Sequence, residues 1–472
     1  MILLPGSPPG PGEDAAGDEP TRSRSRRAWW RRLRTGDWAI DVTCLGVVLM
    51  GFNRWRVGEY PLSDFIFVAA AGIIFVRLLT GRTNTLAPAE ARRSSPLVVV
   101  GALVLLTAGT LSSFGAWDVL GSIGVVLRLA WLTLFWFWIL RSITTRREVF
   151  YRLLRAWRLG VMIIAVVATT GELGLTNFSV ENNEGRQTAF FGHPNDLAGY
   201  LIVALPLVVL WVPRTETGSR RAIKQIAGIA LVGFAIATTG SMSAAIGAIV
   251  GLVSMFVVLL LTRDPRRSKR RHPLFVMLVL TGIGIGFVLL STSDLPVVNR
   301  LSEYNQGGTG VSTSVESRGL RNRLATDRVD ELLVVGIGLD HKSGGKLMEL
   351  PDSPDALFET GVHNMHLKVL LEAGLPGLIG LWIILWTTAL QAWRLMLSTR
   401  NDTLHTTTAA LFGSMVTVNV FAMFQPTLYH RYYWYPIALI GTLWAVRRQE
   451  LRQAGTASSE ADAPAPRRPR VA

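Results

Sequence analysis

Long apolar segments alternate with short polar ones along nearly the whole chain. The apolar segments run for about 16–24 residues, the length that a helix needs to cross a hydrocarbon core of roughly 30 Å. Within lipid such a segment must be helical, because its backbone N–H and C=O groups find no water there. The pattern predicts about twelve spans, at residues 38–53, 62–80, 96–113, 119–140, 156–172, 196–212, 223–239, 242–262, 273–291, 366–390, 405–424 and 432–447.

These spans predict an all-α polytopic membrane protein rather than two or three soluble domains, which chain length alone would allow. Residues 37–448 would form the transmembrane domain. Residues 1–36 and 449–472 are rich in Pro, Ala, Ser or Arg and are expected to be disordered. The largest polar segment, 292–365, separates the ninth span from the tenth and is much longer than a connection between two helices requires.

Basic residues in the connections set the expected topology. Cytoplasmic loops of membrane proteins carry an excess of Lys and Arg. The N-terminal segment with its seven arginines at 21–36 is basic, and so are the alternate connections 81–95, 141–155, 213–222, 263–272 and 391–404. Both termini are therefore expected in the cytoplasm. The segments 173–195 and 292–365 would lie outside, on one face, where they could roof one cavity. The latter holds seven Lys or Arg against eleven Asp or Glu. Arg54 and Arg56 depart from the rule, because they would also lie outside.

The overall charge adds little to this picture. The net charge is +15 and the pI is about 10.7, but most Arg and Lys flank apolar segments, so anchoring at the membrane explains them better than nucleic-acid binding. The single cysteine, Cys44, lies in the first span and cannot form an internal disulfide. No cleavable signal peptide is evident.

Two external segments carry the candidate chemistry. In the first, Pro194 restricts His193 to an extended conformation, and Asn195 or Asp196 can then cap the next helix. Arg186 stands on the side that the positive-inside rule disfavours, which suggests that it binds an anion.

In the second segment, Arg318 and Arg321 would share one face of a helix. The segment also holds Arg323, and its Arg328 would pair with Asp327, Asp330 or Glu331. This run could form a surface helix, or one or two of its arginines could hold a phosphate in bidentate fashion.

The start of the tenth span adds three candidates. His363 would lie at its external mouth, where it could cap the helix or take a proton from a sugar hydroxyl. Asn364 follows it. Glu372 lies about two turns inside the span, where an ionisable group is expensive and points to function, unless it holds the segment 374–377 in place.

Common catalytic motifs are absent from the sequence. It contains no HExxH, CxxC, Walker loop, GxSxG or dinucleotide fingerprint. Metal, ATP and nicotinamide chemistry therefore lose support.

Taken together, these features resemble the O-antigen ligase/polymerase superfamily, bacterial glycosyltransferases of the GT-C type. The resemblance covers roughly residues 38–447. It rests on the twelve spans, the long late loop, the segment Gly192–Ala198 with its His193-Pro194-Asn195, and His363-Asn364 followed by the spacing of Glu372, Gly374 and Gly377.

The resemblance implies a donor glycan on polyprenyl pyrophosphate. It implies an acceptor hydroxyl on a lipid or on a second polyprenyl-linked glycan, and an active site on the outer face of a bacterial plasma membrane. By matching position, Arg186 and Arg318 or Arg321 would bind the pyrophosphate, and His363 would lie near the reaction. Supporting positions are His193, Asn195, Asn364 and Glu372, and Gly336 and Gly338 fit the family's Gly-x-Gly turn.

The chain departs from the family at three places. Leu332–Val335 stands where a proline often precedes the turn, Asn322 where a Trp often follows the helix arginine, and Ser241-Met242-Ser243 where many members have Ser-Arg. The missing arginine leaves more of the positive charge to Arg186 and to the late-loop arginines.

Pyrophosphate is a good leaving group, so the implied reaction needs arginines to stabilise negative charge and a base near the acceptor, but no metal or cofactor. His363 is the predicted base, with Glu316, Asp327 and Asp330 in reserve. Two other functions stay open. A flippase for lipid-linked oligosaccharides would need polar groups near the midplane, where Arg128 is the main candidate. A peptidoglycan-type polymerase would depend on a loop Asp.

Overall fold

The computed structural model describes only part of the chain. The described residues are 38–57, 60–83, 86–93, 95–116, 118–177, 185–210, 219–262, 319, 322, 323, 325–327, 329–339, 362–399 and 402–461. The chain divides into two units, Met1–Trp38 and Ala39–Ala472. Apart from Trp38, every described residue belongs to the second unit.

Helices make up almost all of the described structure. They are α2 (Trp38–Leu49), α3 (Leu62–Leu79), α4 (Ala89–Arg92), α5 (Pro96–Ser113), α6 (Val119–Ala130), the π-helical turn η2 (Trp131–Phe135), α7 (Trp136–Ile143), α8 (Arg147–Glu172), α9 (Pro194–Leu210), α10 (Ser219–Thr238), α11 (Met242–Leu261), α15 (Val329–Leu332), α17 (Met365–Ser398), α18 (Asp402–Ala422) and α19 (Arg431–Ala461). Two short strands, β1 (Arg56–Val57) and β2 (Tyr60–Pro61), pair antiparallel between α2 and α3.

The prediction of an all-α polytopic membrane protein is confirmed. Every predicted span that falls on described residues coincides with a helix, whereas the ninth, 273–291, lies outside the described residues. Within the described part of the chain, six helical segments are long and apolar enough to cross a membrane: α3, α5, the continuous run Val119–Ile143, α8, α11 and α17. Shorter apolar helices occur at Trp38–Leu49, Pro194–Leu210 and Ile223–Thr238.

Two helices extend well beyond the apolar segments that predicted them. α8 begins at Arg147, where Arg147 pairs with Glu450 of α19. α19 continues through residues 449–461, which the composition had placed in a disordered tail. The first part of this extension, Gln449–Ala454, consists of strong helix formers. Glu450 also pairs with Arg447 one turn earlier, at 3.3 Å. Hydropathy therefore marks the part of a helix that crosses lipid, but not its polar end.

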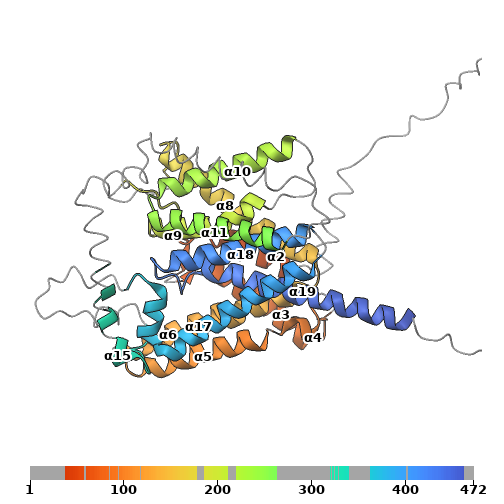
Figure 1. Ribbon diagram of the computed structural model, residues 1–472, viewed down its shortest axis with the longest axis horizontal. Coiled ribbons are helices and arrows are strands. Elements are labelled where there is room, and N and C mark those ends of the chain that lie inside the picture. Colours follow the sequence, from red (N-terminus) through yellow and green to blue (C-terminus); the bar gives the residue numbers. More distant parts are fainter. Residues whose placement is uncertain are drawn as a thin grey trace, which may run out of the picture. The chain divides into compact units, whose positions relative to one another are not determined.

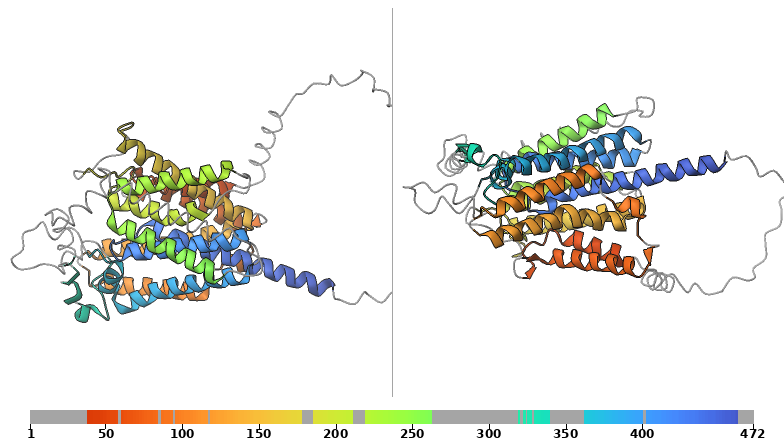
Figure 2. Two further views of the ribbon diagram at one scale, coloured as in Figure 1. Left: turned by 45° about the horizontal axis from the view of Figure 1, so that its top comes forward. Right: turned by 90° about the horizontal axis from the view of Figure 1, so that it is seen from below.

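Small residues let neighbouring helices approach closely. α17 lies along α5, and α18 packs against both α11 and α9 (Figure 1; Figure 2). A Cβ on Gly101 of α5 would lie 2.7 Å from the carbonyl oxygen of Gly380 in α17. A Cβ on Gly251 of α11 would overlap the side chain of Thr417 in α18. Such contacts allow backbone packing where lipid supplies no hydrophobic drive for helix association.

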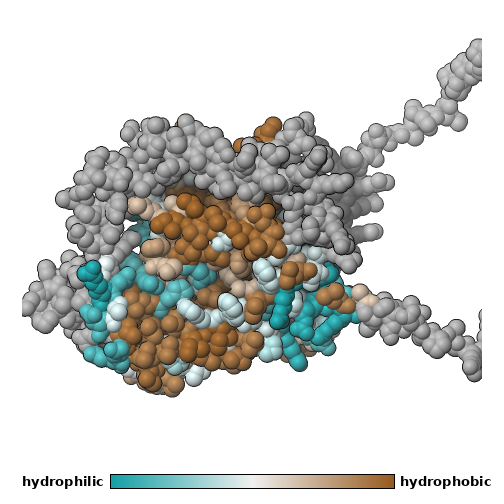
Figure 3. Space-filling model, viewed as in Figure 1, coloured by the Kyte–Doolittle hydropathy of each residue, from teal (hydrophilic) through white to brown (hydrophobic). Residues whose placement is uncertain are grey.

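α9 is the most enclosed of the described helices. Its residues from Pro194 to Val209 are buried except Asp196, so it is surrounded by protein rather than by lipid. On the face shown in Figure 3, hydrophobic residues cover the middle and hydrophilic residues gather towards the two ends, as expected for a bundle set across a bilayer. The candidate residues lie at the end where α3, α9, α17 and α19 begin (Figure 1).

Candidate functional site

Arg186 is buried where the segment before α9 meets the turn between α10 and α11. Its Nε donates to the carbonyl oxygen of Thr239 at 2.6 Å, and its Nη2 donates to Oδ1 of Asn195 at 2.9 Å. The neighbouring Gln187 N–H donates to the Thr238 carbonyl at 3.1 Å. The acceptors in these two contacts are neutral oxygens, and the contacts fix the orientation of the guanidinium.

The first turn of α9 places three polar side chains in different directions. The ring Nδ1 of His193 accepts the backbone N–H of Asn195 at 3.1 Å, so His193 caps the helix. Asn195 is buried and turned to Arg186. Asp196 faces the connection between α18 and α19, where its Oδ1 lies 3.5 Å from Nε2 of His430. In the structure, His193 thus caps α9 and Asn195 holds Arg186.

The turn at Gly336–Gly338 is hydrogen-bonded to α17 where that helix is interrupted. α17 is interrupted at Gly374, whose φ of 68° and ψ of −179° are not helical. The interruption frees the carbonyls of Leu371 and Glu372, which accept the N–H groups of Ile337 and Gly338, each at 3.0 Å. The segment 333–339 therefore completes the hydrogen bonding of a broken membrane helix, as buried backbone requires.

Only glycine fits at this junction. A Cβ on Gly336 would lie 2.2 Å from the carbonyl carbon of Glu372, and one on Gly374 would lie 2.7 Å from the carbonyl oxygen of Val334. Gly374 also has a positive φ, which L side chains rarely adopt. On the same stretch, the Leu375 N–H donates to Leu333 at 2.7 Å. The Gly-x-Gly turn and the Glu-x-Gly spacing are thus two halves of one contact.

Glu372 belongs to a buried ion pair within α17. Its Oε1 lies 3.4 Å from Nζ of Lys368 one turn earlier, and its Oε2 accepts the hydroxyl of Tyr429 at 3.1 Å. Lys368 is 8% exposed and its Nζ lies 5.9 Å from the centre of the Tyr429 ring. Breaking a buried pair leaves an uncompensated charge, so this contact fixes the start of α17 against the connection that precedes α19.

Residues 429–431 join four helices of the bundle. Besides the contacts of Tyr429 and His430, the Tyr429 carbonyl accepts Nη2 of Arg128 in α6 at 3.3 Å. Arg431 forms a two-pronged ion pair with Asp64 in the first turn of α3, with 2.6 Å between Nε and Oδ1. This short polar segment thereby ties α3, α6, α9 and α17 together.

His430 is held neutral by its surroundings. Burial lowers its pKa, the nearby Asp196 raises it, and the positive charges of Arg128, Arg431 and Arg56 lower it further. The ring also stacks on Tyr432, with 5.0 Å between ring centres. The two neighbours of His430 in the chain are each bound from another helix, the Tyr429 carbonyl by Arg128 and the Arg431 side chain by Asp64.

The predicted base, His363, is half-buried just before α17 begins. Asn364 caps that helix, because its Oδ1 accepts the N–H groups of His366 at 3.0 Å and of Leu367 at 3.2 Å. A small apolar cluster lies beside them and contains Ala325, Val362 and Leu371. It packs the late-loop helical segment against the start of α17.

Of the late-loop arginines, the structure describes only Arg323. Arg318 and Arg321 lie outside the described residues, as do Arg328 and Glu316. Arg323, Asp327 and Asp330 are described, and all three are exposed. The structure therefore brings Arg186, His193 and Asn195 together, and separately Asn364 and Glu372, at one end of the bundle.

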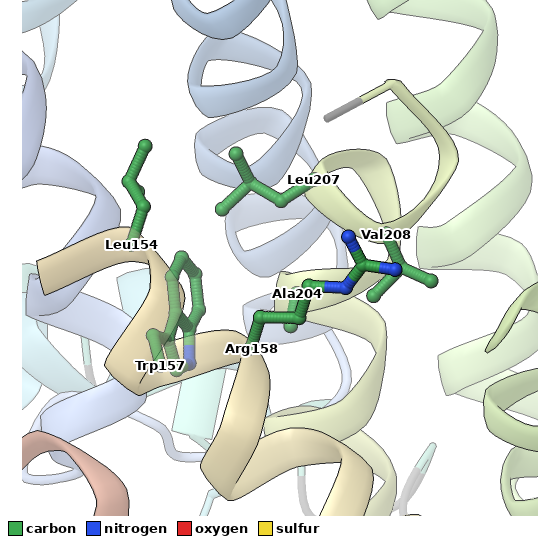
Figure 4. Close-up of a pocket in the computed structure, with 6 residues that line it drawn as sticks. All are labelled: Leu154, Trp157, Arg158, Ala204, Leu207 and Val208. Atoms are coloured by element: carbon green, nitrogen blue, oxygen red, sulfur yellow. The ribbon is translucent and has the colours of Figure 1, made fainter. Parts of the chain in front are cut away.

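The described residues hold no cluster of metal ligands, and a small cavity lies away from the candidate residues. In the described part of the chain, no three His, Cys, Asp or Glu side chains gather as metal ligands would. A small cavity between α8 and α9, with room for about one water molecule, is lined by Leu154, Trp157, Arg158, Ala204, Leu207 and Val208 (Figure 4). It contains none of the candidate residues and has a mostly apolar lining.

Sequence patterns alone did not identify Lys368 or residues 429–431 as part of this end. A signal was present, because Tyr429-His430-Arg431 is a polar run between two apolar spans on the predicted outer side. Arg54 had already been noted as an exception to the charge rule. Arg54 donates to the Phe191 carbonyl at 3.1 Å and to Thr188 Oγ1 at 3.3 Å. These bonds connect the segment of β1 and β2, which we call the hairpin segment, to the loop that carries Arg186.

Residues 227–382 match the family model for O-antigen ligase. The match runs from within α10 to the middle of α17, so it includes both glycine motifs, His363 and Glu372 but not Arg186 or residues 429–431. The resemblance to the O-antigen ligase/polymerase superfamily is thereby confirmed. No curated protein matches the chain.

Proposed function

We propose, from the match of residues 227–382 to O-antigen ligase, that this membrane glycosyltransferase moves a glycan from polyprenyl pyrophosphate to a sugar hydroxyl. The acceptor hydroxyl belongs to a lipid or to a growing glycan. The transfer takes place on the outer face of a bacterial plasma membrane, and both termini of the protein lie in the cytoplasm. The family match carries the proposal.

The arrangement of charge at one end of the bundle supports this function. Arg186, Arg54 and Arg128 come from three separate parts of the chain. Each donates to a backbone carbonyl: Arg186 to Thr239, Arg54 to Phe191 and Arg128 to Tyr429. Three guanidinium groups are thus held in fixed orientations at this end of the bundle. A pyrophosphate leaving group develops negative charge as the glycosidic bond breaks, and preorganised donors stabilise such charge well.

In the proposed reaction the acceptor oxygen attacks the anomeric carbon of the donor. The bond between that carbon and the pyrophosphate oxygen breaks, and the pyrophosphate leaves with the electron pair. His363 takes the proton of the attacking hydroxyl, and Arg186, with Arg318 or Arg321, stabilises the leaving group. No metal ion or nucleotide is needed, since the donor supplies the energy. A base contributes roughly 100- to 10,000-fold in rate.

Transfer by the purified protein tests this assignment. Arg186→Gln should lower kcat by roughly 100-fold or more, as losses of comparable preorganised donors do, and His363→Gln should lower it within the range expected for a base. Arg82→Gln is the matched arginine control, because Arg82 is exposed beyond the far end of α3. His405→Gln is the histidine control, since His405 bonds Thr262 at 2.8 Å, near the end of α11.

Full activity of both site variants would refute the residue assignment. Movement of labelled donor across liposomes without transfer would favour a flippase instead. In cells that lack the protein, long unligated chains would indicate a ligase, and accumulated single repeat units a polymerase.

A further inference from the structure

A second group of arginines surrounds His430, on another side of the first turn of α9. Arg128 is exposed although it lies about two and a half turns inside a membrane-spanning helix. Its bond to the Tyr429 carbonyl is to a neutral oxygen. Arg56, in the hairpin segment, is also exposed, and its Nε donates to the Asn53 carbonyl at 2.8 Å. Neither guanidinium forms an ion pair within the described part of the chain.

The charges around His430 do not balance. Arg431 is neutralised by the two-pronged contact with Asp64. Asp196 is the carboxylate that faces His430. Arg56 stands opposite Pro61, directly before α3 and its Asp64, and Arg128 bonds the carbonyl next to His430. Among the described residues, two positive charges therefore lie beside one carboxylate once the Arg431 pair is set aside. An arginine at membrane depth that lacks a carboxylate partner marks a functional site.

The geometry of α9 separates this group from Arg186. Successive residues of a helix point about 100° apart. Asn195 holds Arg186, whereas Asp196 faces His430. The two cationic groups therefore flank one helix start from different directions.

We propose that Arg56 and Arg128, beside His430, form a second anion-binding site that takes a phosphate or pyrophosphate group of the acceptor lipid. The inference rests on the proposed function, in which Arg186 serves the donor. A transferase must hold two substrates at neighbouring positions, and a lipid-linked acceptor brings its own phosphate to the membrane surface. Guanidinium groups recognise phosphate oxygens in bidentate fashion, and Arg128 belongs to the candidate membrane span Val119–Ile143.

Direct binding tests the site with inorganic pyrophosphate as the probe. The full chain, in nanodiscs of phosphatidylcholine, is titrated calorimetrically. The native protein should bind at two sites. Arg128→Gln and Arg56→Gln should each weaken one of them by roughly tenfold or more, and Arg186→Gln should weaken the other. Thermal unfolding of each variant, with Arg128→Lys as the charge-preserving form, separates lost binding from lost folding.

The outcomes separate this inference from the function on which it rests. Native binding by both Arg56→Gln and Arg128→Gln overturns the second site, and so does a single site that the Arg128 and Arg186 variants both remove. If Arg186→Gln alone leaves binding unchanged, the donor assignment of Arg186 fails while the second site stands.

Kinetics decide which substrate uses the second site. The acceptor glycan is offered with and without its lipid phosphate, at saturating donor. Arg128→Gln should raise KM for the phosphate-bearing acceptor by roughly tenfold and leave KM for the phosphate-free acceptor and for the donor unchanged. A raised KM for the donor, with both acceptor values unchanged, overturns the acceptor assignment.

Discussion

Gly336→Ala should detach the segment 333–339 from the broken helix α17. The added Cβ would lie 2.2 Å from the carbonyl carbon of Glu372, 2.3 Å from its oxygen and 2.5 Å from the nitrogen of Ala373. All three are backbone atoms, which cannot swing away as a flexible side chain does. The segment must retreat by about 1 Å, and hydrogen bonds now at 3.0 Å would then exceed the useful range.

The free energy at stake follows from the bonds that are lost. The bonds from Ile337 and Gly338 contribute about 0.5–1.5 kcal/mol each, and a buried carbonyl left without a donor costs about 1–3 kcal/mol more. The sum is roughly 2–6 kcal/mol of local stability. If the segment opens more easily by that amount, hydrogen-exchange protection falls by roughly 30- to 20,000-fold.

Hydrogen exchange with mass spectrometry, applied to peptides that cover 333–339, measures this loss. Transfer activity should fall with it, because the late segment is then no longer fixed over the start of α17. Gly72→Ala is the matched control, since no atom lies within 4 Å of the Cβ position of Gly72 in α3. Native exchange and native activity in Gly336→Ala would refute the docking of the two motifs.

Other contacts at this end give predictions for thermal or denaturant unfolding in detergent. Glu372→Leu should destabilise the protein by about 3–5 kcal/mol because Lys368 is left buried and unpaired, and adding Lys368→Met should recover most of that loss; equal stability of the single and double variants would contradict the pairing. Arg431→Gln should cost a similar amount, roughly 3–5 kcal/mol, by stranding Asp64, and Asp64→Asn in the same chain should reduce the damage; a change below 1 kcal/mol would count against the pair. Asn364→Ala should cost about 0.5–2 kcal/mol through the lost helix cap, whereas Asn364→Asp should restore it, and unchanged unfolding in the alanine variant would exclude capping.

The spans could be predicted from the sequence because lipid leaves the backbone few alternatives. Hydropathy locates the apolar part of each helix, and all described spans agree with it. The polar ends escaped prediction for the same reason. α8 from Arg147 and α19 beyond residue 448 are held by ion pairs such as Arg147 with Glu450, and the hydropathy of a segment contains no information about its partners.

The candidate site was only half visible in the sequence. The sequence indicated the Gly336–Gly338 turn as part of a loop and the Glu372–Gly374 spacing as part of a helix. Neither local pattern shows that the two segments form hydrogen bonds with each other. Arg431 and Asp64 stand 367 residues apart and neither pattern points to the other. What the sequence did show were charges in unfavourable places. Arg54, Arg56 and Arg128 each broke a membrane rule, and each lies at this end of the bundle.

The ionised side chains at this end divide into two groups with different physical consequences. Lys368 with Glu372 and Arg431 with Asp64 are paired and mostly buried, so they fix the arrangement of α3, α17 and the segment before α19. Arg128 instead bonds a carbonyl oxygen, which orients the guanidinium while leaving its charge in place. Pairing every arginine would have cancelled the field that an anionic substrate needs, and pairing none would have left the helix starts unfixed. Both groups contact the short segment 429–431. This arrangement is expected of a rigid site that binds negative charge.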